Sequence, residues 1–265
     1  MASWLDELSA WDKTWGVNGL AVDVGSDLAK DDLLLPGAPT SGSAILGIQS
    51  AVDHLNVLGD ALRASGLRRP FGYYTLARAA IFASARSIWI LSPEERPCRQ
   101  ERGLWMEWHS DRSFRKTLVQ FQTQSDPGPR AVAHDLADRV ARHQAMLTTA
   151  AATLGVDLTA KHAPSDTEIV ELAGLWLQGP QVDTNLGSGL AWQWRTHSGS
   201  AHSYPWVLVG KADLETTYLD GTGEGTFSPS AEDLGVAFGT GMSATREAMR
   251  LFMARASAVS DQPSA

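Results

Sequence analysis

Helical periodicity is clearest between residues 43 and 65, which read SAILGIQSAVDHLNVLGDALRAS. Apolar side chains recur there every three or four positions, as one face of an α-helix requires, and Gly66 predicts the end of this helix. The next apolar run, residues 73–91, contains only two charged side chains, Arg78 and Arg86. This segment therefore indicates a central helix that is covered on most of its sides.

Capping signals predict further helix starts along the chain. Ser92 followed by Pro93 has the pattern of an N-cap with proline in the first turn. Ser165 and Glu168 have the spacing of a capping box. Ser230 is in position to cap a last helix.

The whole pattern predicts an all-α fold, a single-domain multi-helix bundle of about seven helices. We expect one small β-hairpin near 212–228, where short β-prone segments flank glycine-containing turn residues. Residues 1–42 should form an N-terminal helix and a connecting arm, residues 43–257 the helical domain and residues 258–265 a disordered tail.

Composition narrows the possible functions. The chain has 265 residues, 43% of them hydrophobic, so it can bury a substantial core. Its net charge of −8 provides no global basic field for nucleic acid, and any polyanion would have to be bound by a local cluster of arginines. The only cysteine, Cys98, excludes an intramolecular disulfide and a cysteine-based zinc site and is typical of a reducing compartment. Without a secretory signal or an apolar run that could span a membrane, we expect a cytoplasmic protein that makes no membrane contact.

The strongest candidate for a functional site is in residues 194–202, which read WRTHSGSAH. Arg195 and His202 are seven positions apart, which is almost two helical turns, so their side chains project from one face about 10 Å apart along the axis. A fixed cation beside a titratable imidazole is suited to phosphate chemistry, and the small residues between them would let another surface approach. The neighbouring side chains that could contribute to binding are Trp194, Thr196, His197, Ser198 and Tyr204, together with Arg78 and Arg86.

The pair resembles the arginine–histidine signature of the HEPN ribonucleases and their inactive relatives. The resemblance covers the all-α architecture and residues 192–206, and Thr196 matches the polar residue that follows the arginine in that family. It implies that two protomers pair so that each contributes an arginine and a histidine to one metal-independent site that cuts RNA. It also implies that His202 assists proton transfer during attack by the 2′-hydroxyl and that Arg195 stabilises negative charge on the phosphate.

Several other charged residues allow both a functional and a structural interpretation. Glu95 and Arg99 only partly reproduce the companion motif of the HEPN family, in which an acidic residue precedes a Lys-Arg pair. A second arginine and histidine with the same spacing, Arg102 and His109, lie in an arginine-rich segment, where charges are usually solvated. That segment, residues 91–115, is either a surface with stacking tryptophans for single-stranded nucleic acid or a helix whose arginines pair with its acidic residues. The near balance of its charges favours the second interpretation.

Two more pairs bear on ligands and metals. Arg78 and Arg86 lie in a helix with little polar surface, so each should either pair with a carboxylate or carbonyl group or line a cavity. His134 and Asp138 have a helical metal-ligand spacing, but two ligands are too few. We therefore expect no metal and no cofactor.

Three functions remain open. The first is a metal-independent endoribonuclease of the toxin or defence type, acting as a homodimer with Arg195 and His202 accessible across the two-fold interface; the ten tryptophans favour such an interface. The second is a non-catalytic helical protein that recognises RNA, a nucleotide or a protein partner through a groove containing Arg78, Arg86 or Arg195. The third is a structural protein in which each of these arginines is already paired with an aspartate or a glutamate.

Overall fold

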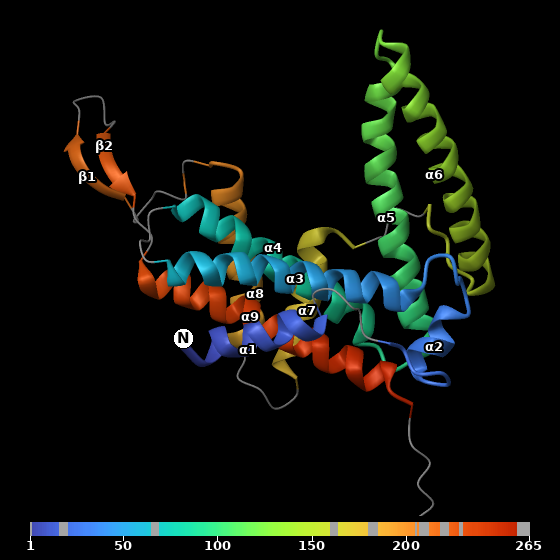
Figure 1. The fold of residues 1–265 in the computed structure, drawn as a ribbon, viewed down its shortest axis with the longest axis horizontal. Helices are drawn as coiled ribbons and strands as arrows, with labels where there is room; N and C mark the ends of the chain where they lie inside the picture. The colour runs from blue at the N-terminus through green and yellow to red at the C-terminus, as the bar shows by residue number, and fades with distance from the viewer. Residues whose placement is uncertain are drawn as a thin grey trace, which may run out of the picture. The chain divides into compact units, whose positions relative to one another are not determined.

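The computed structural model describes residues 2–15, 21–64, 69–159, 164–179, 185–204, 206, 212–217, 223–227 and 230–258. Across these ranges the chain forms nine α-helices and a two-stranded hairpin, so the predicted all-α fold class is confirmed (Figure 1). None of the described helices is long and apolar enough to cross a membrane. The helices are α1 (Ala2–Trp15), α2 (Asp27–Asp32), α3 (Thr40–Arg63), α4 (Pro70–Leu91), α5 (Arg96–Gln122), α6 (Pro127–Thr153), α7 (Asp166–Gln178), α8 (Asn185–Ala201) and α9 (Ala231–Ala256). The strands β1 (Ala212–Thr217) and β2 (Gly223–Phe227) pair antiparallel within the range predicted for the hairpin.

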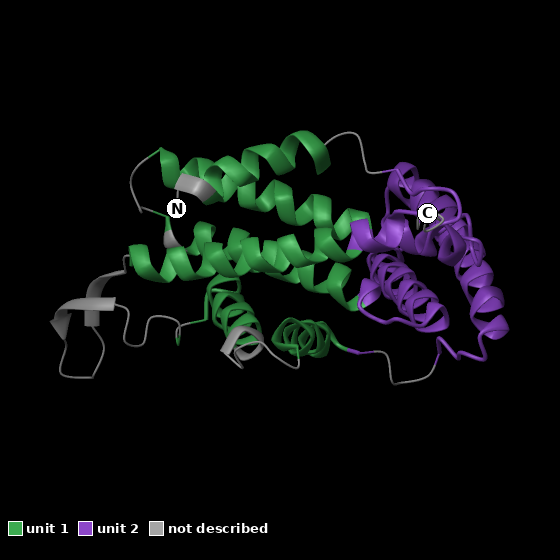
Figure 2. Ribbon diagram, turned by 90° about the horizontal axis from the view of Figure 1, so that it is seen from below, with its two compact units in different colours: residues 1–20, 45–89, 165–251 green, residues 21–44, 90–164, 252–265 purple. Residues whose placement is uncertain are grey.

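The helices belong to two compact units, each made of three segments that are separated in the sequence (Figure 2). Unit 1 contains residues 1–20, 45–89 and 165–251, and unit 2 contains residues 21–44, 90–164 and 252–265. Three unit boundaries fall inside or near the ends of α3, α4 and α9, where an uninterrupted helical pattern gives no sequence signal of a boundary. The predicted limits at 42 and 257 lie close to the start of α3 and the end of α9 instead. From residue 259 onward the predicted tail lies outside the described residues.

In unit 1, helices α3, α4 and α9 share one apolar core, and α1 packs on it. α4 is the central helix that its apolar run predicts, since Ala77, Ile81 and Ile88 are fully buried. Ser84 of α4 and Thr245 of α9 form a buried hydrogen bond of 2.8 Å, which satisfies both hydroxyl groups inside the core.

Two glycines allow neighbouring helices of unit 1 to approach closely. A Cβ atom at Gly47 of α3 would overlap Ser87 Oγ and lie 2.7 Å from the carbonyl oxygen of Ala83 on α4. A Cβ atom at Gly239 of α9 would lie 2.6 Å from the indole ring of Trp4 on α1. Both contacts are too short for real side chains, so each glycine is required by the packing of its neighbour.

Helices α7 and α8 complete unit 1 and pack against each other. The predicted capping box is present at the start of α7: the Ser165 amide donates to Glu168 Oε2 at 2.6 Å, and the Glu168 amide donates to Ser165 Oγ at 3.3 Å. These hydrogen bonds to Ser165 hold the pKa of Glu168 below its usual value. The predicted cap of α9 is also present, because Ser230 Oγ accepts a hydrogen bond of 2.8 Å from the Asp233 amide.

Unit 2 contains the packed pair α5 and α6, and α2 contacts α5 through a buried ion pair. Arg99 of α5 donates from Nε to Asp31 Oδ2 at 2.6 Å and from Nη2 to Asp31 Oδ1 at 3.0 Å. Burial raises the pKa of Asp31 above its usual value, although the neighbouring Arg99 acts in the opposite direction. The sequence predicts only a connecting arm here, because a six-residue helix such as α2 is too short to show a periodic pattern.

The predicted N-cap at Ser92 is wrong. α4 ends at Leu91, α5 begins at Arg96, and Glu95 is the N-cap residue, without a side-chain capping bond. Residues 92–95 form a short connection between the two helices.

Side chains of α5 explain this connection. Arg102 donates from Nη1 to Ser92 Oγ at 3.0 Å, so this hydroxyl is bound to a residue ten positions further along the chain. Arg99 donates from Nη1 to the carbonyl oxygens of Pro93 and Glu94 at 3.1 and 2.7 Å. Tertiary contacts thus replace the local capping pattern.

Candidate functional site

Arg195, the predicted catalytic arginine, lies on α8 and forms an ion pair with Glu171 of α7. The Arg195 side chain is 55% exposed and that of Glu171 is 41% exposed. Its charge is therefore compensated at the surface of unit 1 by a carboxylate, as the structural interpretation of the arginines requires.

His202, the predicted catalytic histidine, directly follows α8 and is exposed. Its amide donates to the Ser198 carbonyl oxygen at 3.0 Å, so the helical turn continues and His202 lies one turn beyond Ser198 on the same face. The centroid of its ring lies 5.7 Å from that of Tyr204. Among the described residues Arg195 contacts Glu171 and His202 contacts Tyr204, so the structure does not bring the two predicted catalytic side chains into contact.

Arg78 of α4 contacts α8 directly. Its Nε donates to Ser198 Oγ at 2.6 Å, and its guanidinium carbon lies 5.2 Å from the centroid of the Trp194 ring. Ser198 Oγ in turn donates to the Trp194 carbonyl oxygen at 2.8 Å, which fixes the hydroxyl orientation. Arg78 is half-buried, and among the described residues it has no carboxylate partner.

The indole ring of Trp194 lies beside the Arg78 guanidinium. The residue is 8% exposed, and the centroid of its ring lies 6.2 Å from that of Phe82 on α4. Its indole N–H is buried and has no hydrogen-bond acceptor among the described residues. A cation above an indole face is held by the ring quadrupole as well as by hydrogen bonds.

His197 lies on the opposite side of α8 from the exposed residues and is only 2% exposed. Its ring stacks on Tyr74 of α4, with centroids 4.6 Å apart and planes 10° apart, and its Nε2 lies 2.7 Å from Gln193 Oε1. Burial and the nearby Asp233 raise the pKa of Tyr74 to about 12. His197 is therefore a core residue in this structure, and the structure does not bring it to the ligand-accessible surface.

The other predicted binding residues are less closely grouped. Thr196 is half-buried, and Tyr204 is 52% exposed. Arg86 is half-buried, and its guanidinium carbon lies 5.8 Å from the centroid of the Phe82 ring. It is eight positions, about two turns, along α4 from Arg78. The structure thus joins Arg78, Ser198 and Trp194 in one cluster.

The arginine-rich segment divides into two parts. In the first part Arg99 and Arg102 are bound inside unit 2, and burial lowers the pKa of Arg102. His109 is exposed and makes no described contact with Arg102, so the structure does not bring this second pair together. In the second part Arg112 and Arg115 are exposed and have no carboxylate partner among the described residues. The arginines of the first part are therefore structural, but the described partners of Arg99 and Arg102 are Asp31 of α2, two backbone carbonyl oxygens and Ser92, and not the acidic side chains of their own helix.

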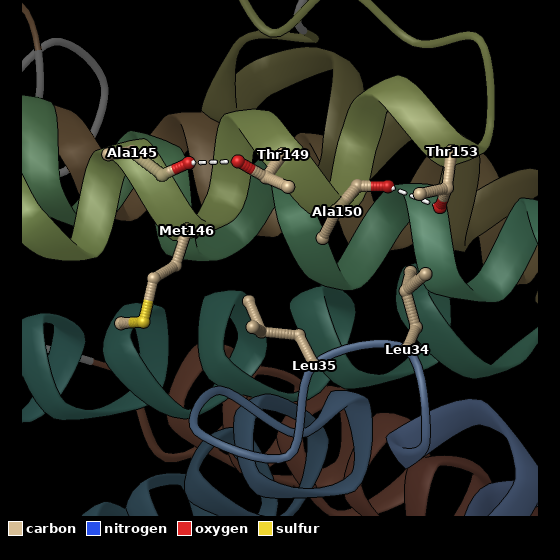
Figure 3. A pocket seen from close by; sticks show the side chains of 7 residues that line it. All are labelled: Leu34, Leu35, Ala145, Met146, Thr149, Ala150 and Thr153. Carbon is tan, nitrogen blue, oxygen red and sulfur yellow. Dashed lines mark hydrogen bonds between the residues drawn. The ribbon is translucent and has the colours of Figure 1, made fainter.

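One further groove of unit 2 is apolar. It has a volume of about 410 Å³ and lies between α6 and the loop that contains Leu34 and Leu35 (Figure 3). The hydroxyls of Thr149 and Thr153 at its edge donate to helix carbonyl oxygens, at 2.9 and 2.7 Å. Its lining offers no ionisable group for catalysis, and across the described ranges no cluster of three or more metal-ligating residues occurs.

The contact between Arg78 and Ser198 could not be read from the sequence, because 120 positions separate the two residues. Each of them was a candidate alone, through the apolar context of Arg78 and the closeness of Ser198 to Arg195. A comparison with protein families, curated proteins and solved structures finds no match for this chain, so its function has to be inferred from the geometry of the site.

Proposed function

We propose that this chain is a HEPN-like helical protein whose unit 1 binds RNA through a phosphate contact at Arg78. The environment of Arg78 carries this proposal. Its half-buried guanidinium contacts a hydroxyl and an indole ring but no carboxylate among the described residues. A cation that is fixed in position without a counter-ion is suited to bind an anion. Arg195 is less suited, because Glu171 already compensates its charge.

The rest of the binding surface follows from the α8 helix. Trp194, Ser198 and His202 occupy positions i, i+4 and i+8, which form one stripe along the helix. Arg78 contacts the first two members of this stripe, and the third is exposed at its end. A phosphodiester bound by Arg78 would therefore have the imidazole of His202 about one turn away along the same face.

Metal-independent cleavage of the bound RNA is the second candidate function. The exposure of His202 favours it, because a general acid–base group has to reach the bound phosphodiester. In the HEPN arrangement cleavage also requires a homodimer. Trp192, Tyr204 and Trp206 are 67%, 52% and 50% exposed, and they offer aromatic surface for a second copy of the chain. The single cysteine supports a reducing, cytoplasmic setting for either function.

Binding is tested by fluorescence anisotropy with a labelled single-stranded RNA. Arg78→Gln should weaken binding about tenfold or more, because a hydrogen bond to a charged group contributes about 1.5–3 kcal/mol. Arg195→Gln is the matched control: it removes the same charge from the same unit and should leave the affinity within about twofold. Equal affinities for wild type and Arg78→Gln, or a larger loss in the control, would contradict the proposed site.

Cleavage is tested on the same RNA in the presence of a metal chelator. His202→Ala should reduce the rate by about a hundredfold or more if the imidazole acts in general acid–base catalysis. Its melting temperature should match that of wild type, because the exposed ring makes only one described ring contact, with Tyr204. If wild-type protein binds the RNA but does not cut it, the cleavage candidate is rejected and the binding function stands.

A further inference from the structure

A second basic site lies in unit 2, along one face of α5. A pocket of about 380 Å³ is present there. We call it the α5 cation pocket; its lining residues are Trp108, Arg112, Arg115, Lys116, Val119 and Gln144. The three cations are exposed. They occupy positions i, i+3 and i+4, so their Cα atoms lie within about 6 Å along the helix axis and their side chains point to one side.

The acidic residues of α5 nearest to the pocket have other partners. Glu107 accepts a hydrogen bond from Ser43 Oγ. Asp111 accepts a hydrogen bond of 2.9 Å at Oδ2 from His143 Nδ1 of α6 when that nitrogen is protonated. Neither carboxylate lines the pocket. Both acidic side chains are therefore engaged by other residues, and neither forms a described ion pair with the cations of the pocket.

The cations of the α5 cation pocket are left without compensation. Among the described residues Arg112, Arg115 and Lys116 form no ion pair, and Arg115 makes only a long hydrogen bond of 3.5 Å to Gln144 Oε1. These three positive charges lie within little more than one helical turn, although the chain as a whole has a net charge of −8. They repel one another, and a bound polyanion would relieve that repulsion.

The aromatic residue of the α5 cation pocket is Trp108. The indole N–H of Trp108 is buried and has no acceptor among the described residues. This N–H is not accessible from the pocket, so Trp108 offers a ligand the rest of its ring, which lines the pocket. Trp108 precedes Arg112 by one turn, and Val119 follows Arg115 by one turn, so apolar side chains lie at both ends of the cationic stripe.

We propose that the α5 cation pocket binds a nucleoside polyphosphate, with the phosphates at the three cations and the base against Trp108. The volume is that of a small-molecule pocket, for which about 300–1,000 Å³ is usual. The concentration of charge also favours a compact ligand, since a single strand of RNA is bound by cations distributed along a groove. Aromatic side chains stack on bases irrespective of their identity, so the proposal concerns nucleoside polyphosphates as a class. It does not depend on the RNA site of unit 1, which uses other residues.

Isothermal titration calorimetry of the full chain with ATP, ADP, AMP and inorganic triphosphate tests the proposal. Affinity should fall about tenfold for each phosphate removed from the nucleotide. Inorganic triphosphate should bind about tenfold more weakly than ATP, because it lacks the base. Lys116→Gln should weaken ATP binding about tenfold, and the triple variant Arg112→Gln/Arg115→Gln/Lys116→Gln about a hundredfold or more.

A second triple variant in the same unit is the matched control. Arg130→Gln/Arg139→Gln/Arg142→Gln removes the same charge from exposed positions of α6 that do not line the pocket, so ATP binding should stay within about threefold of wild type.

Equal losses in the two triple variants, or no binding of ATP by wild type, would overturn the proposal. Inorganic triphosphate as tight as ATP would exclude the base contact and with it the nucleoside. Single-stranded RNA that binds more tightly than ATP and loses its affinity in the pocket variant would overturn the assignment to a compact ligand. Unchanged melting of Lys116→Gln shows that a loss of affinity in that variant is not a loss of folding.

Discussion

Replacing Arg99 with methionine should destabilise the protein strongly at neutral pH. The variant removes a guanidinium whose side chain is 1% exposed and leaves the 0% exposed side chain of Asp31 without its donors at 2.6 and 3.0 Å. It also removes the hydrogen bonds of 3.1 and 2.7 Å to the carbonyl oxygens of Pro93 and Glu94. Removing one partner of a buried ion pair costs about 3–5 kcal/mol, and we expect a loss of unfolding free energy of that size.

The loss should depend on pH. Burial already raises the pKa of Asp31 in the wild type, where Arg99 is the main group that lowers it. Without Arg99 the pKa in the folded state should rise further. A carboxyl group with a raised pKa binds its proton more tightly in the folded than in the unfolded chain, so its contribution to stability is largest below its ordinary value of 3.8 and declines as the pH rises through the folded-state value. The variant should therefore lose less stability at about pH 4 than at about pH 7.

Urea unfolding followed by far-ultraviolet circular dichroism measures both quantities, with the free energy taken from the midpoint and the slope. The double variant Asp31→Asn/Arg99→Met should regain part of the loss at about pH 7, because no buried charge is then left alone. A loss below about 1 kcal/mol for Arg99→Met at neutral pH, or equal losses at the two pH values, would refute the reasoning from burial.

Three further predictions concern stability and are measured by thermal or urea unfolding. Arg195→Ala should change the unfolding free energy by less than about 1 kcal/mol, because its ion pair with Glu171 is exposed; a loss of several kcal/mol would show that the pair is structural. Gly47→Ala should destabilise the protein by about 1–3 kcal/mol through overpacking between α3 and α4. Gly235→Ala in α9 should stabilise it by about 0.5–1 kcal/mol, because a Cβ atom there meets nothing within 4 Å. Effects of the same sign for both variants would contradict the packing argument. Ser165→Ala should cost about 1 kcal/mol through loss of the capping box, and an unchanged midpoint would show that the cap contributes nothing.

The all-α fold could be predicted because long helices carry their own periodicity. The apolar run of residues 73–91 predicts a central helix, and α4 is buried as expected. The cap at Ser92 could not be judged from local sequence, because Arg102 binds its hydroxyl from another helix. The division into two units could not be predicted either, because α3 and α9 each continue across a unit boundary without a break in their helical pattern.

The candidate sites depend on pairings that spacing does not encode. The sequence places Arg195 and His202 on one helix face, but it cannot show that Glu171 of α7 lies beside Arg195. It identifies Arg78 as a cation in an apolar helix without showing that Ser198 receives its hydrogen bond. The near balance of charges along α5 was also an incomplete guide. The sum of the charges does not tell which arginines contact an acidic residue and which remain exposed.

Helix α1 is held on unit 1 by a small set of contacts, one of which is the contact of Trp4 with Gly239. The helix is held by shape at Gly239, by burial of Leu8 in the core, and by the hydrogen bonds of 2.9 and 2.7 Å that Arg246 of α9 donates to Glu7. All of these contacts lie on one short segment, so we expect a chain without residues 2–15 to expose the apolar surface of α3 and α9 that α1 covers. A synthetic peptide with the α1 sequence should bind back to that apolar surface. The protein is therefore suited to fragment complementation, in which the N-terminal helix is supplied as a separate molecule and can carry a label that the rest of the chain does not.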